Sequence, residues 1–260
     1  MNRNHYILIT IVITLCIHTA CSRQVPAETM TPKTSPATFA AAVSEADSLF
    51  RQREDTAKLK QAVDVLATVR QPGDRNFEVE WKFAKYSYFL GGKMSDESES
   101  KKIYEGGRDA GSNASSMEPA KPEGYFWYGA NLGELSRLNP LTVGIKSIDD
   151  LKSSMNKVLE IQPGYQNSGA YDVLAQIEMD SRMFGGSADK AIALLEKALQ
   201  TEKNNMDLHI HLADAYLAVK RDKDARAQLE LALKMPPDPE YLPEYKENLE
   251  DAKKMLKTKF

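Results

Sequence analysis

The chain has 260 residues, of which 42% are hydrophobic and 27% charged, and its formal net charge is −3 at pH 7. This mildly acidic balance argues against a nucleic-acid-binding protein, which needs a concentrated basic face to meet phosphates. The composition instead favours a soluble helical body over a strand-rich fold.

The first twenty residues predict a signal peptide. Arg3 is the only fixed charge before Arg23, and residues 7–17 form an uninterrupted run of apolar residues and threonine. This run has the length of a signal-peptide core and is too short to span a bilayer as a mature helix. We therefore expect residues 1–20 to be a leader segment.

The leader is followed by a candidate lipidation site. Thr19, Ala20 and Cys21 resemble the cleavage box of bacterial lipoproteins, in which a small residue precedes an acylated cysteine. We therefore predict lipidation of Cys21. His18 stands where such boxes favour Leu, Val or Ile, so an ordinary cleaved signal and an uncleaved anchor are the alternatives. By the same resemblance, Ser22 in place of aspartate favours an outer-membrane anchor with the body in the periplasm.

Residues 21–38 are predicted to form a disordered tether. They contain Pro26, Pro32 and Pro36 and no aromatic residue, so they cannot bury enough apolar area to fold. Both cysteines of the chain lie at or before position 21, which leaves the remainder without a thiol for a disulfide or a metal.

Residues 39–236 are interpreted as five helical hairpins, each marked by apolar residues at similar spacing. In the third hairpin the connection is about ten residues longer than in a regular repeat, and we expect an inserted loop at 139–144. The apolar residues that mark the first and second helix of each hairpin are, in chain order, Ala46 and Leu66, Phe83 and Tyr104, Tyr128 and Leu151, Leu174 and Leu195, and Leu212 and Leu229.

The fourth and fifth hairpins share a period of 34 residues, which identifies tetratricopeptide (TPR) repeats. Small residues stand where the two backbones cross, and larger ones fill the space around them. Such hairpins stack into a solenoid that usually presents a binding surface. Three positions carry the repeat: Ala191, Leu195 and Ala198 recur as Ala225, Leu229 and Ala232.

After the last hairpin, residues 240–259 predict a charged terminal helix that caps the array. The sequence thus predicts an all-α fold, a right-handed α-solenoid of about five TPR-like hairpins plus a C-terminal capping helix. We expect residues 39–260 to form one repeat domain.

No catalytic motif is recognisable in the sequence, so we expect neither an enzyme nor a cofactor. His209 and His211 lie two residues apart on a helix and point to nearly opposite sides, so they cannot share a metal ion. We interpret His209 as a packed structural residue. The carboxylates of Asp149 and Asp150 are placed at a helix start, where the backbone dipole stabilises negative charge.

The helix predicted at 125–138 is apolar on nearly all sides, so it is either buried within the array or lines an apolar groove. Burial is the simpler interpretation. The functional hypothesis is that Phe126, Trp127 and Asn131 form a groove for a partner chain or an apolar ligand, because first helices line the concave face of these repeats.

Three short segments stand out between and within the predicted helices: Tyr-Phe-Trp-Tyr-Gly-Ala-Asn-Leu-Gly at 125–133, Asn-Pro-Leu at 139–141, and Arg-Met-Phe-Gly-Gly at 182–186. Together they resemble the T-component of tripartite ATP-independent periplasmic (TRAP) transporters, the TatT-like lipoproteins. The resemblance covers roughly residues 77–235 and includes the insertions between helices.

This resemblance implies a non-catalytic periplasmic lipoprotein that associates with a solute-binding protein and helps to pass apolar organic ligands. Two alternatives stay open. One is an outer-membrane scaffold for the assembly of envelope or pilus proteins, and the other is a stand-alone binder of hydrophobic molecules with a closed apolar tunnel. The repeats also allow a homo-oligomer.

Overall fold

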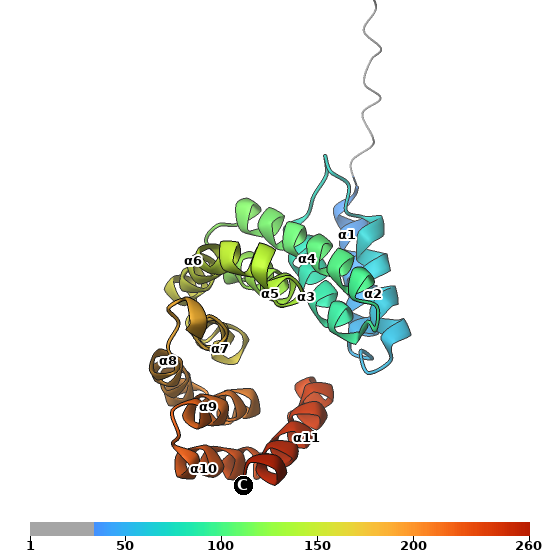
Figure 1. Ribbon diagram of the computed structural model, residues 1–260. Coiled ribbons are helices and arrows are strands. Elements are labelled where there is room, and N and C mark those ends of the chain that lie inside the picture. The colour runs from blue at the N-terminus through green and yellow to red at the C-terminus, as the bar shows by residue number, and fades with distance from the viewer. Residues whose placement is uncertain (1–33) are drawn as a thin grey trace, which may run out of the picture. The chain divides into compact units, whose positions relative to one another are not determined.

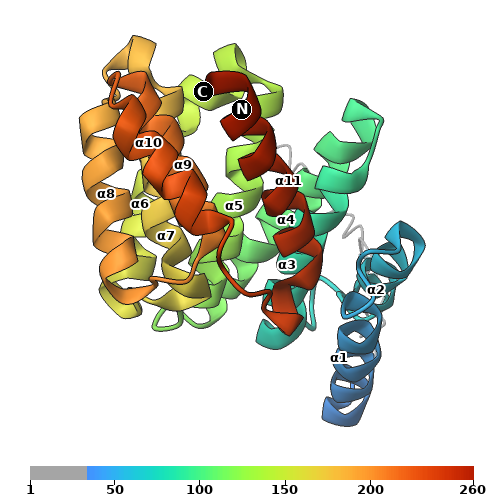
Figure 2. The same ribbon diagram turned by 90° about the horizontal axis from the view of Figure 1, so that it is seen from below.

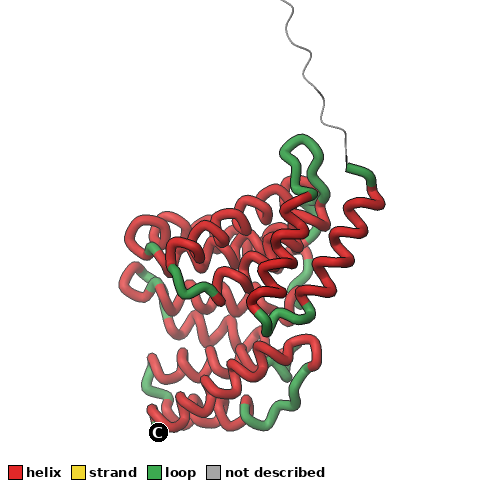
Figure 3. Tube along the Cα trace, turned by 90° about the vertical axis from the view of Figure 1, so that its right-hand side faces the viewer, coloured by secondary structure: helices red, strands yellow, loops and turns green. Residues whose placement is uncertain are grey.

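The computed structural model describes residues 34–260, and this range contains eleven α-helices and no β-strand (Figures 1 and 3). The predicted signal peptide, Cys21 and most of the tether lie outside these residues. The helices are α1 (Pro36–Phe50), α2 (Thr56–Thr68), α3 (Phe77–Lys93), α4 (Glu97–Met117), α5 (Pro122–Leu138), α6 (Ile145–Ile161), α7 (Tyr165–Asp180), α8 (Ala188–Thr201), α9 (Met206–Ala218), α10 (Asp222–Ala232) and α11 (Leu242–Lys259).

The first helix begins earlier than predicted, inside the range assigned to the tether. Ser35 caps α1 by accepting a hydrogen bond from the backbone N–H of Thr38 at 3.1 Å. Pro36 then occupies the first helical turn, where its missing N–H costs nothing and its fixed φ suits the helix.

Consecutive helices pair into five hairpins, α1/α2 to α9/α10, which stack side by side into a curved array (Figure 1). The predicted all-α solenoid is therefore confirmed. The small residues of the last repeat, Ala213, Ala225 and Ala232, have no exposed surface, as close crossing of two backbones requires. Two apolar clusters run along the array and meet in α7, where Leu174 belongs to the first and Ala175 to the second.

The connection between α5 and α6 is helical, so the loop predicted at 139–144 is wrong. Pro140–Gly144 forms a π-helical turn that leads directly into α6. The carbonyl of Asn139 organises this turn by accepting hydrogen bonds from the N–H groups of residues 142, 143 and 144. Asp149 and Asp150 consequently lie beyond the first turn of α6, and the prediction that they stabilise its start is also wrong.

The last helix does more than cover the end of the array. After α10 the chain crosses the open side of the curve, and α11 then runs back toward α9 and α10 (Figure 2). Arg53, in the turn between α1 and α2, donates two hydrogen bonds of 2.7 Å to the Glu244 carboxylate and one of 2.6 Å to the Glu240 carbonyl. Lys93 at the end of α3 pairs with Glu247 at 3.2 Å.

We call these contacts between α11 and the first two hairpins the clasp; they join residues more than 150 positions apart. None of the described helices is both long and apolar enough to cross a membrane.

Candidate functional site

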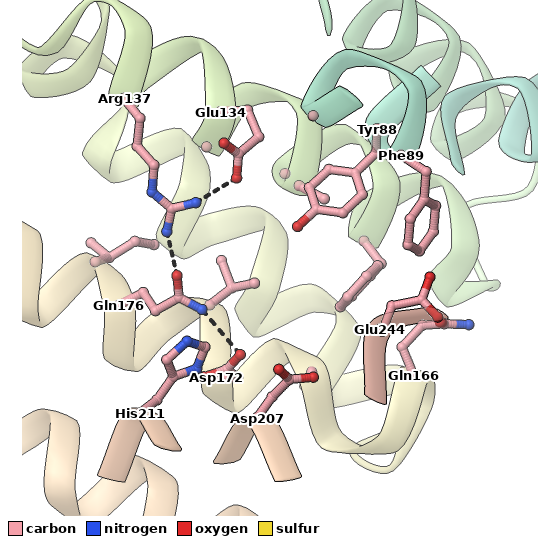
Figure 4. Close-up of a pocket in the computed structure, with 18 of the residues that line it drawn as sticks. Tyr88, Phe89, Glu134, Arg137, Gln166, Asp172, Gln176, Asp207, His211 and Glu244 are labelled. Carbon is pink, nitrogen blue, oxygen red and sulfur yellow. Dashed lines mark hydrogen bonds and ion pairs between the residues drawn. The ribbon is translucent and has the colours of Figure 1, made fainter. Parts of the chain in front are cut away.

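A cavity of about 950 Å³ occupies the concave side of the array. Its walls come from the first helices of four hairpins, α3, α5, α7 and α9, together with α11 (Figure 4). Because the clasp holds α11 in place, this last helix and the earlier α3 border the same half-open space. The cavity is at the upper end of the range typical for ligand pockets.

One side of the cavity is aromatic. Tyr88 and Phe89 from α3 meet Phe126 and Trp127 from α5, and we call these four residues the aromatic wall. Their ring centroids lie close together, with Phe126–Trp127 at 5.0 Å, Tyr88–Phe89 at 5.4 Å and Tyr88–Trp127 at 5.8 Å. These distances and tilted geometries are those of favourable aromatic pairs, so the wall is a firm apolar surface.

The other side carries a chain of polar side chains that crosses three first helices (Figure 4). On α5, Arg137 donates to Glu134, and it also donates to Gln176 on α7. Gln176 donates to Asp172 at 3.0 Å, and Asp172 pairs with His211 Nδ1 of α9 at 2.7 Å. We call these five residues the polar ladder. It links the concave faces of successive repeats and leaves charged groups facing the cavity.

The charge of the ladder depends on His211. Burial alone would lower its pKa, but the charge and hydrogen bond of Asp172 outweigh burial and raise the pKa of His211 to about 9. His211 is therefore protonated at neutral pH, and its link to Asp172 is an ion pair.

Asp207, at the start of α9, stands beside the ladder (Figure 4). It is open to the cavity and otherwise surrounded by protein, and this burial raises its pKa to about 6, partly offset by the charge of His211. No ion pair joins Asp207 to a cation between residues 34 and 260. Its carboxylate is ionised at neutral pH without a salt-bridge partner in this part of the chain.

A strained turn lies at the edge of the cavity. Gln166, Asn167 and Ser168 have φ values of 48°, 52° and 63°, in the left-handed region. Each such non-glycine residue costs about 1 kcal/mol or more, so the surrounding contacts must hold the turn. Asn205 donates to the Asn167 carbonyl at 3.1 Å, and the hydroxyls of Ser168 and Thr201 are 3.1 Å apart. The turn brings Gln166 and Asn167 to the cavity lining.

The three residues of the predicted groove have different positions in the structure. Phe126 and Trp127 line the cavity, with 7% and 2% of their surface exposed. Asn131 is fully buried and outside the lining, and its side chain donates to the carbonyls of Ala84 at 3.0 Å and Trp127 at 2.7 Å. Its contacts therefore tie α5 to α3. A binding role for the other two stays a prediction.

The two histidines point to different sides, as expected from their spacing. His209 is 7% exposed and contacts Gln228 at 2.6 Å and the Lys203 carbonyl at 3.1 Å, which fits a packed structural residue. His211 instead belongs to the polar ladder, which was not predicted from the sequence. The available signal was the recurrence of charged residues on the inner face of the first helices, such as Asp172 and His211.

Comparisons with known proteins agree with the fold and find similarity to proteins other than the TRAP T-component. Residues 42–169 match the family described as regulator of microtubule dynamics protein 1-3, and residues 185–242 match a tetratricopeptide repeat family. Regulator of microtubule dynamics protein 1 of Caenorhabditis elegans is 23% identical over 204 residues, which are 73% of this chain and 88% of the relative.

Solved structures with the same fold are helical-repeat proteins. A thermophilic TPR protein of Thermus thermophilus superposes with a TM-score of 0.58 at 19% identity, covering 81% of this chain and 98% of its own. A double mutant of RS-1 MamA gives 0.52 at 14% identity, with 76% and 93% coverage. These likenesses show the fold, and together with the repeat match they support a TPR-type protein-interaction scaffold.

The resemblance to the TRAP T-component is wrong. The segments that carried it, at 125–133, 139–141 and 182–186, fall largely within the region similar to the microtubule-regulator family and at the start of the TPR match. They lie on α5, at the π-helical turn and in the turn before α8, where any stack of helical hairpins needs close packing or a reversal. Short motifs that reflect packing recur in unrelated helical repeats.

Proposed function

We propose that this protein is a non-catalytic scaffold that binds a polypeptide segment of a partner protein in its concave cavity. The observation that carries the proposal is the cavity itself, which is built from the first helices of consecutive repeats and bordered by α11. Solenoid repeats commonly use this concave surface for binding. The strained turn at residues 166–168 is a second support, because strain concentrates at functional sites.

The cavity favours a peptide over a purely apolar molecule. Its aromatic wall suits apolar side chains, whereas the polar ladder and Asp207 would be desolvated by an apolar ligand that offers no hydrogen bonds. A polypeptide supplies both apolar groups and backbone donors and acceptors. The name of the C. elegans relative, a regulator of microtubule dynamics, is consistent with action through a protein partner. We propose binding to a protein partner for this chain, and we do not propose that the partner is the microtubule.

Photo-crosslinking from inside and outside the cavity tests this proposal. A photo-reactive amino acid replaces Val173, which lines the cavity from α7, or Ala193, which is exposed on α8 of the same hairpin. We expect a partner polypeptide to be crosslinked from position 173 and not from position 193, and the adduct to be absent without light. Equal crosslinking from both positions, or crosslinking from position 193 alone, would place the partner elsewhere.

We also propose that the scaffold is held at the cell envelope through Cys21. The support is the cleavage-box resemblance at 19–21, which lies outside the described residues. Two or more acyl chains would anchor the protein stably, whereas one chain binds only marginally. Cells grown with radiolabelled palmitate should label the parent protein and not Cys21→Ser, with Cys16→Ser as the control; labelling of Cys21→Ser would contradict the assignment.

A scaffold for the assembly of envelope or pilus proteins is a more specific form of the proposed scaffold function. It requires both the anchor at Cys21 and peptide binding in the cavity. Loss of membrane association in Cys21→Ser, with crosslinking from position 173 retained, would separate the anchor from the binding function.

A further inference from the structure

The lining of the cavity is acidic. Within the described chain, seven carboxylates line it, against the cations Lys93, Arg137 and His211. Two of the cations are already paired inside the ladder, and Lys93 is paired with Glu247. A cavity with excess negative charge and partly apolar walls attracts cations and repels anions. The carboxylates are Glu134, Asp172, Asp180, Asp207, Asp238, Glu244 and Glu247.

Asp207 and Asp238 are the two carboxylates of this lining that have no ion pair within the described residues, and Asp238 is already used as the cap of the short turn before α11, where it accepts from the Glu240 N–H at 2.9 Å. Asp172 has His211, Glu134 has Arg137, and Glu244 has Arg53, whereas Asp207 has no ion pair within the described residues. The rise of its pKa to about 6 reflects the cost of holding its charge in a buried place. A cation delivered by a ligand would offset that cost, and the gain would appear as binding affinity.

Asp207 and the aromatic wall favour one orientation of a bound ligand. Asp207 comes from α9, whereas the aromatic wall comes from α3 and α5, so charged and apolar groups of a ligand are drawn to opposite sides (Figure 4). Lys85 adds to this asymmetry, because its ammonium lies 5.6 Å from the Trp127 ring without lining the cavity. A second cation is therefore disfavoured at the aromatic wall and favoured at Asp207.

We infer that the segment bound in the cavity is basic: a lysine or arginine side chain pairs with Asp207 while neighbouring apolar side chains pack on Tyr88, Phe89 and Trp127. This inference rests on the proposed function and specifies the chemistry of the partner. Acidic segments are disfavoured by repulsion from Asp207 and the other carboxylates of the lining. A small amine alone would leave most of the 950 Å³ unfilled, so a peptide fits better.

Three capped peptides of one length test the charge preference. Their sequences are Gly-Leu-Lys-Phe-Lys-Leu-Gly and the same peptide with both lysines replaced by glutamine or by glutamate. Binding to the full chain is measured by calorimetry at low and physiological salt. In a Trp81→Phe background, Trp127 is the sole tryptophan and its fluorescence reports binding in the cavity.

We expect the lysine peptide to bind at least about 10-fold tighter than the glutamate peptide, with the difference shrinking as salt rises. Asp207→Asn should weaken the lysine peptide by about 5- to 10-fold, as expected for a lost charge-assisted hydrogen bond. Asp214→Asn is the matched control, because it makes the same charge change on an exposed position of the same helix. It should leave the affinity almost unchanged.

The outcomes separate this inference from the proposal on which it rests. If the three peptides change Trp127 fluorescence with equal affinity, the cavity is a peptide site and the inferred charge preference is wrong. The inference also falls if Asp207→Asn and Asp214→Asn weaken the lysine peptide equally. If no peptide changes Trp127 fluorescence, the proposed function fails together with the inference.

Discussion

The Glu80 cluster and the polar ladder contain the same kinds of side chain, but the first is buried and the second is partly exposed to solvent. Glu80 on α3 is fully buried, and it accepts two hydrogen bonds from Arg70 at 2.8 and 2.9 Å, one from Arg75 at 2.8 Å and one from Asn113 at 3.1 Å. In the polar ladder, by contrast, 46% of the Arg137 side chain is exposed. The hydrogen-bonding capacity of Glu80 is fully used within the protein, whereas side chains of the polar ladder can still form hydrogen bonds with a ligand.

This contrast separates charges that stabilise the fold from charges that remain available to a ligand. At Glu80 every lone pair that could meet a ligand is already used, and removal of one partner leaves other charges buried. In the cavity, solvent and ligand compete for the same groups, so each pair stabilises the fold less. Arg53 of the clasp is intermediate, because it is 5% exposed and its partner Glu244 has 25% of its side chain exposed.

The largest effect is expected at the Glu80 cluster. Glu80→Gln removes the charge that Arg70 and Arg75 compensate, and it should lower the free energy of unfolding by about 3 kcal/mol or more in urea titrations. Glu78→Gln is the control, because 53% of the Glu78 side chain is exposed and its pair with Lys82 at 3.3 Å is open to solvent on the glutamate side. That change should cost less than about 0.5 kcal/mol.

The Glu80 cluster should also affect how the stability of the fold depends on pH. Burial alone would raise the pKa of Glu80, but the hydrogen bonds and charge of Arg70, with Asn113 and Arg75, lower it below 4.5. A depressed pKa stabilises the fold above pH 4.5, and this stability is lost as pH falls through the folded-state pKa. Glu80→Gln should therefore lose less stability on acidification than the parent; equal losses would mean that the cluster is not saturated as described.

An intermediate effect is expected at the clasp. Arg53→Ala removes two charge-assisted hydrogen bonds to Glu244 of α11 and one to the Glu240 carbonyl just before it, which should raise the rate of amide hydrogen exchange in residues 242–248. We expect local stability there to fall by about 1–2 kcal/mol. Arg51→Ala, an exposed change in the same turn, serves as the control. Unchanged protection of α11 in Arg53→Ala would show that the Arg53 contacts do not hold this helix in place.

Much of the fold followed from apolar spacing, because TPR packing places small residues where helices cross. The N-terminal hairpins were found in the same way, although the glycines at 106, 107 and 111 of α4 have low intrinsic helix propensity. The structure shows why two of these positions are glycine. A Cβ at position 107 would lie 2.2 Å from the Asn131 side chain, and a Cβ at position 111 would lie 2.4 Å from the Tyr128 backbone, so any larger residue would clash. These glycines allow α4 and α5 to approach closely, which sequence propensity does not reveal.

The site was harder to predict than the fold, because it depends on contacts between residues far apart in the sequence. Phe126 and Trp127 were found from the apolar character of α5, whereas the ladder joins residues 39 positions apart, such as Asp172 and His211. Closure of the cavity depends on Arg53 meeting Glu244, 191 positions away. The left-handed turn at 166–168 contains no glycine that would signal it.

The smallest expected effect on stability lies in the ladder, at the pair Asp172–His211. The raised pKa of His211 means that its ion pair stabilises the fold fully below pH 6.5 and that this stability is lost as pH rises through about 9. Because 36% of the His211 side chain is exposed, solvent screens the pair, and the stability difference should stay below about 1 kcal/mol.

The pKa of His211 is the more sensitive readout of that pair. In Asp172→Asn, NMR titration of the His211 ring should give a clearly lower pKa, because burial is then opposed by the charge of Asp207 without that of Asp172. Asp214→Asn, an exposed change on α9, should leave the value near 9. A His211 pKa that stays near 9 in Asp172→Asn would mean that Asp207 supplies the charge instead. Asp207 would then be paired with His211. In that case Asp207 would not be available to a ligand, and the contrast with the fully hydrogen-bonded Glu80 would no longer hold for it.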